Sequence, residues 1–240
     1  MRPTLFAAVL MPGLALARSV EVEPGTMASS PLPMMTLLAA MALLPFAVVM
    51  LTSFSKIVVV LSIARSALGT QQAPPTMVLT GLAAVLSAHI MAPVVERSYL
   101  SARCAYESSA STAQLLSSAA TVALPLREFL VKHGNAEERA RFTELARELR
   151  PQADAQQVSE EDLTVIIPAF VITELKEAFI IGFLIFLPFL VLDMLVANVL
   201  LALGMQTLSP SQVSLPFKIL LFVAVDGWAL LSRGLILGYR

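Results

Sequence analysis

The sequence predicts an all-α membrane protein with about four long apolar helices and a charged segment between the second and the third. Of its 240 residues, 57% are hydrophobic and 14% are charged, whereas about a quarter of a soluble domain is charged. The mean hydropathy is +0.80. The apolar residues gather in four stretches, 34–51, 77–95, 178–203 and 219–231 with its flanks. Composition and clustering together indicate an integral membrane protein.

The N-terminus has the pattern of a secretory signal peptide. Arg2 supplies the positive start, an apolar core follows, and Ala15 and Ala17 give the small-x-small pattern that signal peptidase reads. We therefore expect a signal peptide at residues 1–17, cleaved after Ala17, and then a polar N-terminal segment at 18–33. An uncleaved anchor is the alternative, but a core of twelve residues is short for a membrane span.

The first apolar region, residues 34–95, contains an interruption that orients the chain. Residues 52–76 carry Lys56 and Arg65 and no acidic residue. Cytoplasmic loops of membrane proteins carry an excess of Lys and Arg. We therefore expect a cytoplasmic loop at 52–76.

Residues 96–162 form the charged part of the chain, with 19 of its 33 charged residues. We expect this soluble segment to lie across the membrane from the loop, in the periplasm of a Gram-negative bacterium. Within it, residues 137–150 place apolar side chains from Phe142 to Leu149 at helical spacing, which predicts an amphipathic helix. Residues 108–123, rich in Ser, Ala and Thr, predict a flexible connector.

The C-terminal apolar helical region, residues 163–240, holds the strongest apolar run. Residues 178–203 contain eighteen Leu, Ile, Phe or Val residues. On the insertion scale these contribute roughly −5 to −11 kcal/mol, against roughly +3 kcal/mol for Asp193. The segment therefore inserts in spite of the charge.

Five prolines lie in or beside the predicted apolar helices: Pro45, Pro93, Pro168, Pro188 and Pro216. Each removes a backbone hydrogen bond and bends its helix, and in lipid the freed backbone groups need partners from protein. Helices of this kind favour packing against other chains, so we expect an oligomer.

Seven charged residues in or near the apolar runs are candidates for ion pairs that fix the assembly: Lys56, Arg65, Glu174, Lys176, Asp193, Lys218 and Asp226. A charge inside a spanning helix marks a functional site by default. Lys218 and Asp226 would lie about 12 Å apart on one stripe of a helix, so each needs a partner on another helix. We interpret the seven as inter-subunit ion pairs, and direct contact with substrate or protons is the alternative.

Three ordered blocks of sequence carry a resemblance to a known family. They are Thr52-Ser53-Phe54-Ser55-Lys56 with Ala64-Arg65-Ser66-Ala67-Leu68-Gly69 and Gln71-Gln72, then Pro168-Ala169-Phe170 with Thr173-Glu174-Leu175-Lys176 and Asp193, and finally Leu215-Pro216-Phe217-Lys218 with Asp226-Gly227-Trp228. Together they resemble the FliP/SctR (YscR, HrcR) family, the export-gate membrane proteins of flagella and type III secretion systems. The Gln71-Gln72 pair favours the injectisome branch, whereas a cleavable signal is more usual in the flagellar branch.

The resemblance implies a non-enzymatic component of a secretion export gate, without cofactor, metal or catalytic residues. Several copies, five in the family, join FliQ/SctS-like and FliR/SctT-like proteins in a helical ring. This ring is the entry portal through which unfolded substrate proteins cross the bacterial inner membrane. The family also closes its pore with a run of methionines. Here only Met205 of that run is present, so we expect Met205 and Leu208 to form the gasket.

Two other function classes fit part of the pattern. An intramembrane aspartyl protease would use Asp193 and Asp226, but acid–base catalysis needs both carboxylates within bonding reach. A small-solute secondary transporter would also carry charges near the membrane midplane, but that class commonly shows inverted repeats, and we find none. The net charge of −1, without a basic cluster, argues against a nucleic-acid partner. The single cysteine, Cys104, excludes a disulfide within the chain.

Overall fold

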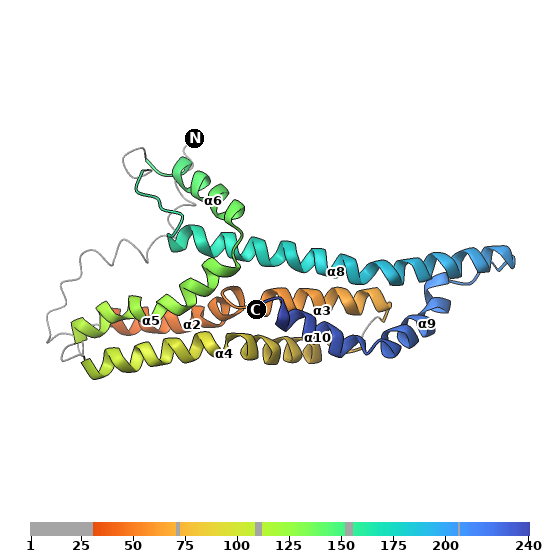
Figure 1. Cartoon of the computed structure of the whole chain (residues 1–240), viewed down its shortest axis with the longest axis horizontal. Coiled ribbons are helices and arrows are strands. Elements are labelled where there is room, and N and C mark those ends of the chain that lie inside the picture. Colours follow the sequence, from red (N-terminus) through yellow and green to blue (C-terminus); the bar gives the residue numbers. More distant parts are fainter. Residues whose placement is uncertain (1–30, 71–72, 109–111, 152–155, 206) are drawn as a thin grey trace. The chain divides into compact units, whose positions relative to one another are not determined.

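The computed structural model describes residues 31–70, 73–108, 112–151, 156–205 and 207–240. Throughout these ranges the regular secondary structure is helical, which confirms the predicted fold class. The helices are α2 (Pro31–Met50), α3 (Phe54–Leu68), α4 (Thr76–Ser108), α5 (Thr112–His133), α6 (Ala136–Glu148), α8 (Leu163–Ala202), α9 (Pro210–Ala224) and α10 (Gly227–Leu237) (Figure 1). The predicted signal peptide, with Ala15 and Ala17, lies outside the described residues.

The chain divides into two compact units, Met1–Pro45 and Phe46–Arg240. The first unit includes the part of α2 that precedes Phe46. Helices α3 to α10 all belong to the second unit, and so do the buried charges that the sequence singles out.

Helix α3 is the buried centre of the second unit, and it corrects the prediction of a loop at 52–76. Ile57, Val60 and Leu61 have no exposed surface, and α3 packs between α8 and α4 (Figure 1). The two basic residues of this segment made it resemble a loop, because a charge is unexpected in a buried helix. The helix ends at Gly69, which takes the left-handed conformation with a φ of 75° and donates its N–H to the carbonyl of Ser66.

Helix α8 runs without interruption from Leu163 to Ala202, with Pro168 and Pro188 inside it. Its 40 residues rise about 60 Å, about twice the thickness of a bilayer hydrocarbon core. Helices α3, α5, α6 and α9 pack along it. At Gly182 the backbone of α8 approaches α3 so closely that an added Cβ would lie 2.4 Å from Ile63 Cδ1. A small residue at this point therefore sets the distance between the two helices.

Most of the described residues of the charged segment 96–162 are helical, and helices α5 and α6 of this segment pack against α4 and α8. Helix α4 continues to Ser108, beyond the predicted boundary at residue 95, and α5 occupies most of the expected connector at 108–123. The predicted amphipathic helix is confirmed as α6, where the Asn135 side chain accepts a hydrogen bond from the Glu137 N–H as an N-cap. Its packing face differs from the expectation: Leu149 is 86% exposed.

Helices α9 and α10 are separated by a break that the sequence did not reveal. They meet at an angle of 58°, and Asp226 lies between them with a left-handed φ of 51°. Lys218 and Asp226 therefore do not share one continuous helical stripe, which corrects that part of the prediction. The aromatic ring of Phe222 packs edge-on against Trp228 across the break, with ring centroids 5.1 Å apart.

Three apolar clusters hold the second unit together. One joins α3 to α4, α8 and α10 around Leu61. A second joins α4, α5, α8 and the C-terminus around Phe170. The third joins the last turn of α3 to α8 and α9 through Leu68, Phe189 and Phe222. Each cluster draws on helices that are distant in sequence, and α8 contributes to all three of them, whereas α3 contributes to the first and the third.

Two of the described helices are long and apolar enough to cross a membrane: Thr76–Cys104 within α4, and α8. The number rises to four if each of two bent helix pairs forms one span, Met41–Met50 with Phe54–Leu68 and Pro210–Ala224 with Gly227–Leu237. Much of the apolar surface is exposed on the chain: only 11% of the apolar window of α8 is buried.

Candidate functional site

A buried ion cluster joins α3 to α8 at Lys56. The Lys56 ammonium lies 3.1 Å from Glu174 Oε1 and 2.6 Å from Glu177 Oε2. The Glu174 side chain has no exposed surface, and that of Lys56 is 5% exposed, whereas that of Glu177 is half exposed. A cation and a carboxylate that are both removed from water depend on each other, because breaking such a pair leaves an uncompensated buried charge.

The C-terminus of the chain closes this cluster through Tyr239. Its hydroxyl donates a hydrogen bond to Glu174 Oε2, and the Lys56 ammonium lies 4.4 Å from the centre of its ring, a cation–π contact. The Tyr239 ring also stacks on Phe129 and contacts His133 of α5. Both oxygens of Glu174 therefore accept hydrogen bonds, one from α3 and one from the C-terminus.

His133 lies at the end of α5, outside the candidate spans. Burial lowers its pKa below the usual 6.5, and the positive charges of Lys132 and Lys56 lower it further. A depressed histidine pKa means that the folded protein favours the neutral imidazole. The ring therefore serves as an aromatic neighbour of Phe129 and Tyr239 at neutral pH.

A second buried ion pair joins α9 to α8. The Lys218 ammonium lies 2.6 Å from Asp193 Oδ2, with side chains 5% and 29% exposed. Lys218 also donates to the carbonyl of Ala67 in α3, at 3.3 Å. The hydroxyl of Ser214, one turn before Lys218, donates to Asp193 Oδ1. Both carboxylate oxygens of Asp193 are thus occupied by donors from α9.

The two ion sites lie far apart on the same helix. Nineteen residues separate Glu174 from Asp193, a rise of about 28 Å along α8. The first site holds the start of α3 and the C-terminus to α8, and the second holds α9 and the end of α3 to it. The pairs of Lys56 and Lys218 form within one chain, whereas the sequence interpretation placed such pairs between subunits.

The remaining charged candidates are placed differently. Lys176 lies 3.6 Å from Glu138 of α6 in a pair that is exposed on the lysine side. Arg65 donates to the carbonyl of Pro74 and to the hydroxyl of Thr76, which are both neutral groups.

Asp226 is exposed at the break between α9 and α10. Because Asp193 is bound to Lys218 and Ser214, the described contacts bring no second carboxylate to it for acid–base catalysis.

The gasket candidates lie where the chain turns from α8 to α9. Met205 and Leu208 are about half exposed, at 47% and 46%, and the Met205 N–H donates to the carbonyl of Leu200. Gln206, between them, lies outside the described residues.

Sequence reasoning missed four members of the ion sites: Glu177, Ser214, Tyr239 and His133. For two of them a signal was present. Glu177 lies three residues after Glu174, and Ser214 lies four residues before Lys218, and residues at these spacings share a helix face. For Tyr239 and His133 the sequence holds no such signal, because only the tertiary fold brings α5 and the C-terminus to Glu174.

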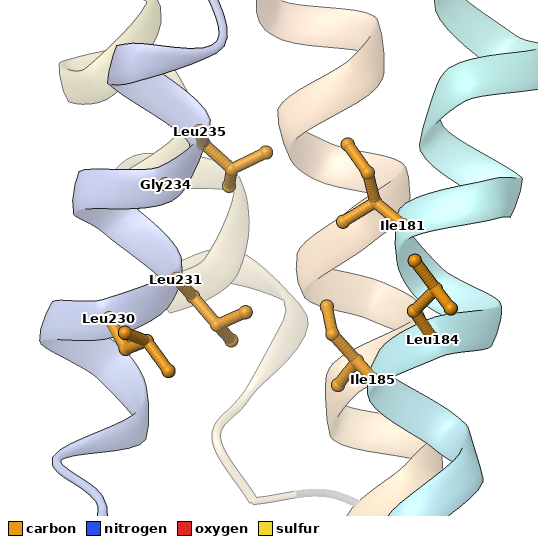
Figure 2. A pocket seen from close by; sticks show the side chains of 7 residues that line it. All are labelled: Ile181, Leu184, Ile185, Leu230, Leu231, Gly234 and Leu235. Atoms are coloured by element: carbon orange, nitrogen blue, oxygen red, sulfur yellow. The ribbon is translucent and has the colours of Figure 1, made fainter.

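An apolar pocket of about 380 Å³ lies between α8 and α10. Figure 2 shows side chains from the two helices that face each other across it. The pocket is lined by Ile181, Leu184 and Ile185 of α8 and by Leu230, Leu231 and Leu235 of α10, with Gly234. This lining carries no titratable or nucleophilic side chain. Among the described residues, no group of three His, Cys, Asp or Glu side chains is arranged to hold a metal ion.

Comparison with known proteins places these features in a family. The model of the FliP family matches residues 37–235. The hypersensitivity response secretion protein HrcR of Ralstonia nicotianae is 48% identical over 203 residues, which cover 84% of this chain and 94% of the relative. Yop proteins translocation protein R of Yersinia pestis is 44% identical over 205 residues, covering 84% and 93%. The flagellar biosynthetic protein FliP of Caulobacter vibrioides is 39% identical over 239 residues, covering 98% and 87%. The chain, with its buried ion pairs along α8, belongs to the FliP family.

Proposed function

We propose that this protein is a core component of a type III secretion export gate, through which unfolded substrate proteins cross the inner membrane. The family match over residues 37–235 carries this proposal, together with relatives named for secretion and translocation. The role is structural rather than enzymatic: the protein contributes to a portal, and the energy for transport comes from elsewhere.

The distribution of charged and apolar groups supports an assembly of several chains. Lys56, Glu174, Lys218 and Asp193 already have partners inside the chain, so the single chain is internally tied along α8. Large apolar side chains of α8, Phe183 among them, remain exposed. Because α8 is about twice as long as a bilayer core is thick, lipid alone cannot cover its apolar length in an upright orientation. Other protein chains are the natural cover.

These other chains are, in our proposal, further copies of this protein and FliQ/SctS-like and FliR/SctT-like proteins. The copies form a ring of five, and the turn between α8 and α9 faces its pore. Repeated Met205 and Leu208 side chains close the pore there, because flexible thioether and leucine side chains adapt to a narrow opening. Gln206 and Thr207 make this constriction wetter than a run of methionines would.

The orientation follows from the charge pattern. Arg65, which has only neutral partners among the described residues, marks the end of α3 as the cytoplasmic side, and in our proposal the charged segment 96–162 lies in the periplasm. Cys104 is exposed and belongs to this segment. It should react with a membrane-impermeant thiol reagent added from outside the inner membrane, before partner proteins assemble. Labelling that requires disruption of the inner membrane would mean the opposite orientation.

Among the branches of the family, we place this chain in the injectisome branch. The Ralstonia and Yersinia relatives are 48% and 44% identical, whereas the Caulobacter flagellar protein is 39% identical. The expected substrates are therefore secreted effector proteins rather than flagellar subunits.

The test is complementation in the native bacterium. Deletion of the gene should abolish secretion of type III substrates, and the wild-type chain should restore it and migrate as a large assembly on native gels. Co-purification should recover the two partner proteins. Lys176→Gln serves as the matched control, because the Lys176 pair is largely exposed and such pairs contribute little. Normal secretion after deletion, or a purified monomer that transports a small solute, would overturn the proposed function.

A further inference from the structure

Arg65 and Asp226 are two opposite charges in the apolar helices that have no oppositely charged partner among the residues that the structure describes. Lys56 and Lys218 are each paired with a carboxylate. Within the described part of the chain, the Arg65 guanidinium donates to two neutral oxygens, of Pro74 at 3.4 Å and of Thr76 at 2.9 Å. The Asp226 carboxylate is exposed and takes part in no ion pair or hydrogen bond within the described ranges.

The fold places these two opposite charges at the same level of the helix bundle. Asp226 lies between Phe222 and Trp228, which both pack on the cluster that includes Leu68 in the last turn of α3. Arg65 belongs to that same last turn. The residues on both sides of Asp226 therefore pack in the same apolar cluster as the turn that carries Arg65, yet no ion pair joins Arg65 and Asp226 among the described residues of one chain.

Each charge is surrounded by exposed apolar side chains. Next to the Arg65 partner Thr76, Met77 and Val78 are 87% and 57% exposed, and Val223, close to Asp226, is 71% exposed. A lone charge in such a surface is costly once the surface is covered by lipid or protein, unless the covering chain supplies the opposite charge. The two surfaces therefore have complementary charges in matching apolar surroundings.

We propose that Asp226 of one copy of this protein forms an ion pair with Arg65 of the adjacent copy. This inference rests on the proposed function only in requiring a ring of copies. Neighbours in a helical ring meet head to tail, through two different surfaces of the same chain. Surfaces at a similar level of the chain meet when the axis of the assembly runs along the helices. The pair joins the break between α9 and α10 of one copy to the end of α3 in the next.

Cross-linking between chains tests the contact directly. In a Cys104→Ser background, differently tagged Asp226→Cys and Arg65→Cys chains are co-expressed with the full secretion system. They are then treated with a short bismaleimide, whose two thiol-reactive ends each form a thioether with a cysteine, because an arginine side chain holds the two backbones further apart than a disulfide allows. We expect a covalent dimer that carries both tags, and no dimer from either variant alone.

Arg233→Cys replaces Arg65→Cys in the matched control. Arg233 is another exposed base on α10, seven residues after Asp226 and about 10 Å further along the helix. A dimer with Arg233→Cys instead of Arg65→Cys overturns the proposal, as does a cross-link from Asp226→Cys to a different membrane protein only.

A double-mutant cycle measures the energetic coupling. Asp226→Asn removes the charge and keeps a residue that tolerates a positive φ, and Arg65→Gln keeps a donor for its neutral partners. Each single variant should lower the amount of assembled ring at least about tenfold, since it leaves a charge unpaired in an apolar interface. The double variant should assemble as well as either single variant. Independent residues would instead give a double variant whose loss of assembled ring is the product of the two single losses.

Additive losses in the cycle, together with the absence of the mixed dimer, overturn the inter-subunit pair. This failure is distinct from failure of the proposed function. In the first case the wild-type chain still forms the ring and restores secretion, whereas in the second it does neither.

Discussion

The pair of Lys218 and Asp193 should respond unequally to loss of its two partners. The Lys218 side chain is 5% exposed and, among the described residues, has the carbonyl of Ala67 as its one acceptor besides Asp193. The Asp193 side chain is 29% exposed and keeps the Ser214 hydroxyl as a donor. Removing the carboxylate therefore leaves a cation buried without a counter-charge, whereas removing the ammonium leaves an anion that water and Ser214 still reach.

From these environments we expect Asp193→Asn to lower the free energy of unfolding by about 3–5 kcal/mol. Lys218→Met, which keeps most of the side-chain stem, should cost about 1–3 kcal/mol, the range for a buried polar group that loses one partner. The double variant Asp193→Asn/Lys218→Met should be more stable than Asp193→Asn alone, because it no longer buries an unpaired ammonium. Secretion should follow the same order.

The assay is reversible unfolding of the purified chain in detergent, with denaturant titrations of the four proteins of this mutant cycle. Native gels of solubilised membranes show in parallel whether each variant still assembles. Equal losses for Asp193→Asn and Lys218→Met would refute the argument from unequal burial. A double variant that loses the sum of the two single losses would show that the pair is not coupled.

Three further predictions concern other parts of the chain. Gly182→Ala should destabilise the protein by about 1–3 kcal/mol through overpacking against Ile63, and Ile63→Ala in the same chain should recover part of this loss in denaturant titrations. His133, whose pKa is lowered by burial and two nearby lysines, binds its proton less readily in the folded state than in the unfolded state. The stability tied to its neutral form is therefore complete above about pH 6.5 and is lost as the pH falls below it, and His133→Gln should flatten this dependence in melting experiments from pH 7.5 to 5. Met205→Ala should leak small ions while the ring remains intact, and unchanged ion flux in secreting strains would mean that Met205 is ordinary packing.

The sequence allowed prediction of the helical class, of the longest apolar run and of the amphipathic helix. The apolar run at 178–203, which forms the second part of α8, follows from composition, and the amphipathic helix predicted at 137–150 follows from its periodicity. These features depend on residues that are neighbours in the chain, so local propensity and hydrophobic patterning determine them.

Helix α3 was mistaken for a loop because the rule that places basic residues in cytoplasmic loops takes each charge alone. Lys56 can lie in a buried helix because Glu174 and Glu177, more than a hundred residues later, supply the opposite charge. The break at Asp226 was missed for a similar reason. The apolar run continues through it, and the packing of Phe222 against Trp228 joins the two sides of the bend.

By itself, the sequence determined which residues carry charge inside apolar helices and, through three ordered blocks, the family to which the chain belongs. Only the tertiary structure decided which charges pair: Lys56 with Glu174 and Glu177, and Lys218 with Asp193. The physical reason is that an ion pair depends on distances of a few ångströms between side chains. Those distances arise where α3 and α9 pack along α8, and no local pattern in the sequence encodes that packing.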